Sequence, residues 1–190
     1  MLLKGTLSIL FIFCFHTSRS QPINLQQLID TATRYSSLFV NAKPLAVDLE
    51  VDRIFLYNEW LYEQKKIRLP DSIFVQLINN SKKVDTSHWT NKELPSFIIV
   101  NGKYSQINLQ DALNKFPTID TLKINKYNKA NPEDRIVFFF SRPGFDNSKS
   151  YAVVRYDNGH SWLMGGGGIK LYHLEGETWR EMALLVRWSY

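Results

Sequence analysis

The sequence is poor in cysteine, in histidine motifs and in long hydrophobic runs, and each absence excludes a class of protein. Cys14 is the single cysteine of the 190-residue chain, so no disulfide can form within it and its stability must come from a core. The histidines form no His-x-x-x-His motif, and no cysteine pair is available as a zinc ligand. No apolar run reaches the roughly 20 residues that a membrane-spanning helix needs. We therefore expect neither a disulfide scaffold nor a metal site.

The N-terminus has the layout of a secretory signal peptide. Lys4 provides the positive charge, residues 5–15 are almost entirely apolar, and a short polar stretch follows. Cleavage is expected after Ser20, because Ser18 and Ser20 are small residues of the kind that a signal peptidase requires.

This pattern sets the expected domains and localisation. Phe13 precedes Cys14 where a lipoprotein signal has a small residue, so a lipid anchor is not expected. The sequence predicts a signal peptide over residues 1–20 and a single domain over residues 21–190, which is large enough for one core. The mature protein would be periplasmic or secreted, with no stable membrane anchor.

Charge and composition exclude two further classes. The formal net charge of +5 would fall to +3, because cleavage removes Lys4 and Arg19 and no acidic residue. The lysines are scattered among acidic residues and form no single basic face, so no nucleic-acid partner is expected. With 44% hydrophobic and 14% aromatic residues, the chain is too apolar for intrinsic disorder.

Helical signals dominate the first two thirds of the mature chain. Apolar residues recur at helical spacing after Asn24, Pro70-Asp71 opens a second helix, and Asn108 caps another. Asn101-Gly102 is typical of a hairpin turn, and residues 123–135 are polar and without period, which predicts a loop. The expected elements are helices over residues 25–38, 54–66, 71–80 and 108–116, a strand over 47–51, and a hairpin of 97–100 with 103–107.

The C-terminal third predicts successive strands with short turns, which can only be antiparallel. Together with the preceding helices, this gives an α+β fold: short helices in the N-terminal two thirds and an antiparallel β-meander at the C-terminus. The expected strands are residues 136–140, 151–156, 160–164, 169–175 and 179–188, with turns at 157–159, 165–168 and 175–177.

The glycine run Gly165–Gly168 invites a phosphate-binding interpretation, which its context excludes. A P-loop places lysine and Ser/Thr directly after its last glycine and then begins a helix, whereas Ile169 here opens a strand. A kelch-like spacing of the glycines, Tyr172 and Trp179 occurs only once, too few times for a propeller. We predict a hairpin or bulge in which the glycines provide positive φ.

One stretch resembles a known group of sequences. Ser141-Arg142-Pro143-Gly144-Phe145, Tyr151–Val154, the glycine run and Gly176–Trp179 are similar to the C-terminal module of uncharacterised exported bacterial proteins. The resemblance covers roughly residues 136–188 and implies no assigned activity. Many similar sequences have cysteines before the glycines, where this chain has His160-Ser161-Trp162, and this departure argues against a thiol or metal role.

The candidate functional residues are few. Tryptophan and tyrosine are abundant and commonly anchor interfaces, so we expect a binding surface that includes Arg142, His160 and Trp162. No catalytic, cofactor-binding or metal-binding residue is assigned, and no cofactor is expected. His160 and Ser161 would point to opposite faces of a strand, and no Gly-x-Ser-x-Gly motif occurs.

Two functions remain open at this point. The first is a non-catalytic extracytoplasmic module that binds a small ligand or a protein. The alternative is a hydrolase acting on an extracytoplasmic polymer or peptide, with His160 as its first candidate.

Overall fold

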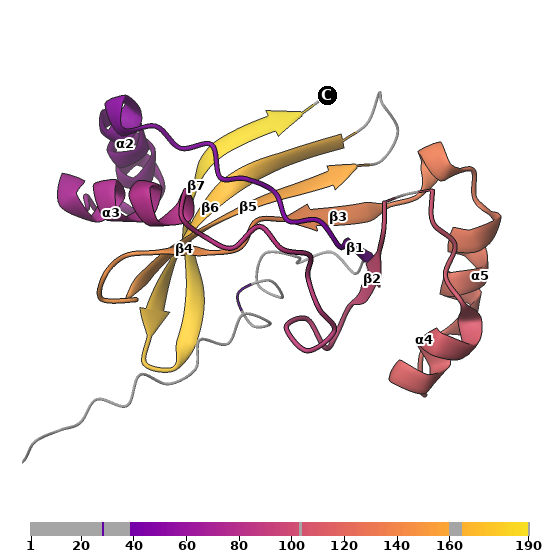
Figure 1. Ribbon diagram of the computed structural model, residues 1–190. Helices are drawn as coiled ribbons and strands as arrows, with labels where there is room; N and C mark the ends of the chain where they lie inside the picture. Colours follow the sequence, from indigo (N-terminus) through magenta and orange to yellow (C-terminus); the bar gives the residue numbers. More distant parts are fainter. Residues whose placement is uncertain (1–27, 29–38, 103, 160–164, 190) are drawn as a thin grey trace, which may run out of the picture.

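The computed structural model describes residues 28, 39–102, 104–159 and 165–189, which form a mixed sheet with helices packed on it (Figure 1). The strand order is β2-β1-β3-β5-β6-β7, and β4 pairs with β5. This arrangement confirms the α+β class. The strands are β1 (Phe39–Asn41), β2 (Ile98–Val100), β3 (Val137–Phe140), β4 (Gly144–Phe145), β5 (Tyr151–Gly159), β6 (Gly165–Glu175) and β7 (Thr178–Ser189).

The C-terminal meander is confirmed. β3, β5, β6 and β7 are neighbours in the sheet, and each adjacent pair is antiparallel. The β6–β7 hairpin turns at Gly176, whose φ of +63° lies in the region that favours glycine. The strand expected over residues 160–164 lies outside the described residues.

The first strands are parallel, and the sequence did not predict this. β1 lies between β2 and β3 and is parallel to both. The helix expected over residues 25–38 falls almost wholly outside the described residues. The expected strand over residues 47–51 is wrong: Val47 and Leu49 are buried on alternate positions, but the segment has no partner strand and continues into the 3-10 turn Val51–Arg53.

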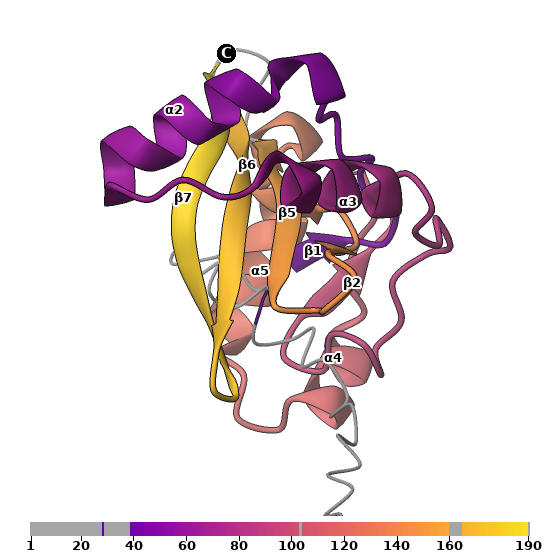
Figure 2. The same ribbon diagram turned by 90° about the vertical axis from the view of Figure 1, so that its left-hand side faces the viewer.

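Two pairs of helices cover one face of the sheet at its two ends (Figures 1 and 2). α2 and α3 pack on the β5–β7 end through apolar residues such as Tyr57, Phe74 and Leu171. α4 and α5 pack on the β2–β1–β3 end, with Ile124 and Tyr127 buried. The helices are α2 (Ile54–Lys65), α3 (Asp71–Ser81), α4 (Leu109–Lys115) and α5 (Thr121–Lys129), with a further 3-10 turn at Pro132–Asp134.

Helix α5 replaces most of the loop expected over residues 123–135. Asp120 caps it by accepting a hydrogen bond from the N–H of Leu122. Only Ile124 and Tyr127 are buried along it, and two apolar positions one turn apart are too few to reveal a helix by periodicity.

The expected hairpin around Asn101-Gly102 is also wrong. Gly102 does turn the chain, with φ +81°, but residues 104–107 form no strand and lead to α4. β2 instead pairs with β1, which lies far away in the sequence.

The glycine run lies inside β6, so the turns expected at residues 165–168 and 157–159 are both wrong. Positive φ among the described glycines occurs at Gly102 and Gly176 only. A Cβ added at Gly167 would lie 2.4 Å from the carbonyl oxygen of Tyr156 and 2.7 Å from the Trp188 ring. The glycine is therefore required for close packing of β6 under a tryptophan, rather than for backbone conformation.

Candidate functional site

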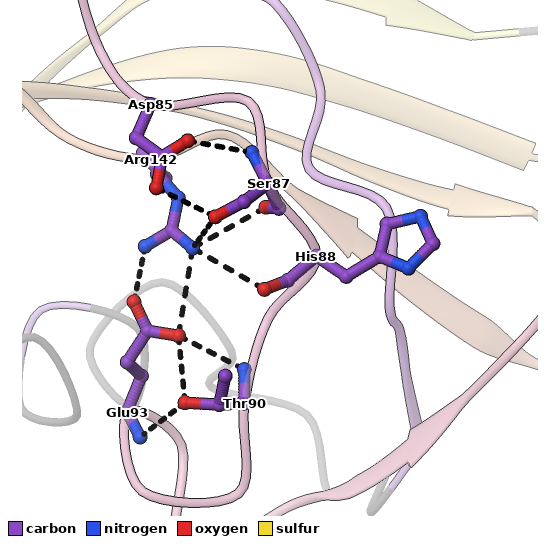
Figure 3. A network of polar contacts seen from close by, with 6 residues as sticks. All are labelled: Asp85, Ser87, His88, Thr90, Glu93 and Arg142. Carbon is purple, nitrogen blue, oxygen red and sulfur yellow. Dashed lines mark hydrogen bonds and ion pairs between the residues drawn. The ribbon is translucent and has the colours of Figure 1, made fainter.

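Arg142, one of the expected binding residues, lies in a network of internal contacts (Figure 3). Its guanidinium forms a close ion pair with Glu93 and hydrogen bonds to the carbonyl oxygens of Ser87 and His88, at 3.3 and 3.4 Å. It also stacks 4.4 Å above the centre of the buried Trp89 ring. The side chain is only 11% exposed. These contacts fix the loop before β2 to the sheet, which is a structural use of the arginine.

The Glu93 end of this network forms a capping box with Thr90. The Glu93 carboxylate accepts the Thr90 N–H at 2.9 Å, and the Thr90 hydroxyl accepts the Glu93 N–H at 3.4 Å. The hydrogen bond from Arg142 is the main cause that lowers the pKa of Glu93. The motif forms a turn and no helix, because Pro95 follows within two residues.

The expected binding residues are not brought together by any described contact, since His160 and Trp162 lie outside the described residues. The hydrolase hypothesis gains nothing from His88. Ser87 donates a 2.5 Å hydrogen bond to Asp85, but the His88 ring points away from both residues (Figure 3). A serine nucleophile needs its base within hydrogen-bond reach.

A cavity of about 230 Å³ lies between β2, the loop that follows it, and α4. β2 contributes an apolar surface, and the remaining lining is polar and carries one charge of each sign. Sequence reasoning missed this site, because no local pattern indicates that Asn91, β2 and Lys115 come together. The polar lining includes Asn91, Asn101, Gln106, Asn108, Asp111 and Lys115.

Among the described strands β2 is the last on its side of the sheet, so the edge of β2 that faces away from β1 is called its free edge, and β2 lines the cavity. The carbonyl oxygen of Val100 accepts the N–H of Ala42 at 2.8 Å, so the backbone of Val100 faces β1. Successive residues of a strand direct their N–H and C=O groups to opposite edges. The N–H and C=O of Ile99 therefore point away from β1, and Ile99 lines the cavity. The backbone groups of Phe97, two residues earlier, point the same way as those of Ile99. The carbonyl oxygen of Phe97 accepts a hydrogen bond from Lys115 on α4.

Lys115 marks one end of this edge. Its ammonium group donates to the carbonyl oxygen of Phe97 and to the side-chain oxygen of Asn91, both at 2.6 Å. Partial burial lowers its pKa by desolvation of the charge. These contacts use two of the three N–H donors of an ammonium group, which leaves one that can be directed into the cavity.

The opposite edge of the sheet is treated differently. The Gln64 carboxamide on α2 accepts the N–H of Leu184 and donates to its carbonyl oxygen, both at 2.9 Å. The side chain thus takes the place of a neighbouring strand's peptide group on β7. Covering edge groups in this way hinders unwanted strand pairing, whereas the β2 edge faces a cavity.

Comparisons with known proteins add no assignment. No protein-family model, no curated protein and no solved structure matches the chain. Within residues 39–102, 104–159 and 165–189, no group of three histidine, cysteine or acidic side chains is placed to hold a metal ion. In the same part of the chain, none of the helices combines the length and the apolar character that crossing a membrane requires.

Proposed function

We propose that the protein is an exported, non-catalytic module that binds an extended peptide segment at the free edge of β2. Two observations carry this proposal: the backbone of Val100 faces β1, so that the N–H and C=O of Ile99 are directed away from β1, and Ile99 lines the cavity. A sheet edge that offers a donor and an acceptor can take up a further strand, in which backbone hydrogen bonds provide affinity.

The chemistry of the cavity favours a peptide over other ligands. Its described lining includes carboxamide side chains, one carboxylate and one ammonium group beside the apolar side of β2. Carboxamides both donate and accept hydrogen bonds, as peptide groups do. A nucleotide or a sugar would favour an aromatic stacking surface, and the described lining of this cavity contains no aromatic ring.

The contrast between the two sheet edges supports the same site. Gln64 already makes both backbone bonds of Leu184 on β7. An incoming strand would have to displace that side chain on β7, whereas on β2 it would enter an existing cavity.

Export is the second part of the proposal and rests on the pattern of residues 1–20. Sequencing the N-terminus of the protein recovered from its native host tests it directly. The expected first residue is Gln21, and a chain that keeps Met1 and stays in the cytoplasm would contradict export.

Peptide binding is tested with two pools of randomised N-acetylated hexapeptides, one with free C-termini and one with C-terminal amides. Both pools are titrated together into isotope-labelled protein. The expected result is a shift of the backbone amide signals of Ile99 and Asn101, because these residues lie along the proposed edge. Unchanged signals at both residues would overturn the proposal.

A pair of variants at one position separates strand addition from side-chain effects. Ile99→Ala keeps the N–H, whereas Ile99→Pro removes it on the side that faces away from β1, where proline is tolerated. Peptide binding should survive in Ile99→Ala and fall in Ile99→Pro. Equal binding by the two variants would show that no strand adds at this edge.

A further inference from the structure

The free edge of β2 has a direction, which follows from how α4 runs beside it. After β2 the chain turns at Gly102, lines the cavity over residues 105–108 and begins α4 at Leu109. Lys115 at the end of α4 contacts the carbonyl oxygen of Phe97, directly before β2, so α4 ends beside the N-terminal end of the strand. Since the chain leaves β2 at its other end, we infer that α4 runs back along the strand. The positive charge of Lys115 therefore lies at the N-terminal end of β2.

The negative charge of the cavity lies further along the strand. Asp111 also lines the cavity and precedes Lys115 by four residues on α4. Residues at this spacing occupy the same face of a helix about 5–6 Å apart between Cβ atoms. Since α4 runs back along β2, Asp111 lies nearer the C-terminal end of the strand. The cavity is thus positive at one end and negative toward the other.

This polarity selects one direction for an added strand. A strand that pairs antiparallel to β2 ends beside the N-terminal end of β2, next to Lys115. A free α-carboxylate there would meet an ammonium group, and the N-terminal part of the peptide would lie toward Asp111. A parallel strand would place its N-terminal end near Lys115 and its C-terminal end toward Asp111. Both ends of a free peptide would then meet a side chain of the same charge.

We propose that the site recognises the free C-terminal carboxylate of a peptide bound antiparallel to β2, with Lys115 as the residue that binds the carboxylate. This inference rests on the proposed function and adds the ligand class. Lys115 is held by Asn91 and Phe97, so the ammonium group is already positioned before the ligand arrives. Partial desolvation strengthens its attraction for an anion, because the effective dielectric constant is lower than in water.

The direct test compares the two hexapeptide pools separately, since they differ only at the C-terminus. A hydrogen bond to a charged group contributes about 1.5–3 kcal/mol, so the free-acid pool should bind roughly tenfold to hundredfold more tightly than the amide pool. Equal binding of both pools at Ile99 would overturn the carboxylate inference and leave peptide binding intact. Binding of neither pool would overturn both.

Variants of Lys115 locate the effect. Lys115→Met should abolish the preference for the free acid, whereas Lys115→Arg should keep it, because the charge remains. Lys123→Met is the matched control: Lys123 is exposed on α5 and does not line the cavity. A preference that survives in folded Lys115→Met would contradict the assignment. If that variant does not fold, loss of the preference in Lys115→Arg would contradict it instead.

Two sources of the carboxylate are separated by peptide length. A free dipeptide carries both termini and would place its ammonium group near Asp111, whereas a protein C-terminus carries the carboxylate alone. Binding of divaline as tightly as the acetylated hexapeptides would indicate free short peptides. Tight binding of the hexapeptides alone would indicate the C-terminus of a longer chain.

Discussion

Proline substitutions at two adjacent positions of β2 should have very different effects on stability. The backbone of Ile98 faces β1, because it lies two residues before Val100, whose carbonyl oxygen bonds to Ala42. The backbone of Ile99 is directed away from β1, and Ile99 lines the cavity. Proline removes an N–H in both variants, but only at Ile98 does the loss break the pairing between β1 and β2.

The magnitude follows from comparison with alanine at the same position, which cancels the loss of the isoleucine side chain. At Ile98, proline removes the N–H that is directed toward β1. Loss of a backbone hydrogen bond has a net value of about 0.5–1.5 kcal/mol, and an acceptor left unpaired costs about 1–3 kcal/mol more. Ile98→Pro should therefore be about 1.5–4.5 kcal/mol less stable than Ile98→Ala. Ile99→Pro should lie within about 1 kcal/mol of Ile99→Ala, since its N–H has no partner on β1.

Urea unfolding followed by fluorescence measures the free energy of unfolding of the proline and alanine variants at both positions. The comparison requires that the free energy of unfolding depends on urea concentration with the same slope in all four variants. Equal penalties for proline at the two positions would refute the assignment of edges on β2. A larger penalty at Ile99 would mean that Ile99 carries the pairing with β1, and the proposed binding edge would be lost with it.

Three further predictions concern the rest of the fold. Gly167→Ala should lower the free energy of unfolding by about 1–3 kcal/mol, because the added methyl group overlaps Tyr156 and Trp188; unchanged stability in urea would contradict this packing. Gln64→Ala should speed hydrogen exchange at the Leu184 amide and cost about 1 kcal/mol or less, whereas the neighbouring exposed Glu63→Ala should leave that exchange rate unchanged. Glu93 has a folded pKa below its ordinary 4.5, so its pairing with Arg142 stabilises the protein above that pH and loses this effect as pH falls through the lower value. The stability difference between wild type and Arg142→Met should therefore shrink from pH 7 to pH 3, and a constant difference would contradict the pairing.

Local signals predicted those elements that depend on local chemistry. Asn108 caps α4 by accepting the N–H groups of Gln110 and Asp111, as its position before an apolar stripe indicated. Gly176 turns the β6–β7 hairpin with positive φ. These features depend on residues a few positions apart, so the sequence contains the whole cause.

Features that depend on distant residues were missed. β1 forms a strand because β2 and β3 flank it, and nothing within Phe39–Asn41 specifies those partners. The glycine run predicted a turn, but position 167 requires a glycine because Trp188, twenty-one residues later, packs over it and leaves no room for a side chain. α5 has too few buried residues to show a period.

The cavity beside β2 was missed for the same reason. The cavity is lined by Asn91, β2 and Lys115, which are separated along the chain. They come together only in the folded protein, where one edge of β2 pairs with β1 and the other edge faces α4. The one residue among the expected candidates that is described, Arg142, proved to be engaged inside the protein by Glu93. A hydrophobic or charged pattern along the chain does not distinguish such an internal partner from an external one.

If a peptide adds to β2 through the backbone of Ile99, its affinity must depend on the Ile99 N–H, and the ratio of two dissociation constants measures that dependence. A single acetylated hexapeptide recovered from the free-acid pool is titrated calorimetrically into Ile99→Ala and Ile99→Pro. We expect a dissociation constant about tenfold higher for Ile99→Pro than for Ile99→Ala, because one backbone hydrogen bond to the peptide is lost. Equal dissociation constants in two folded variants would contradict strand addition at this edge.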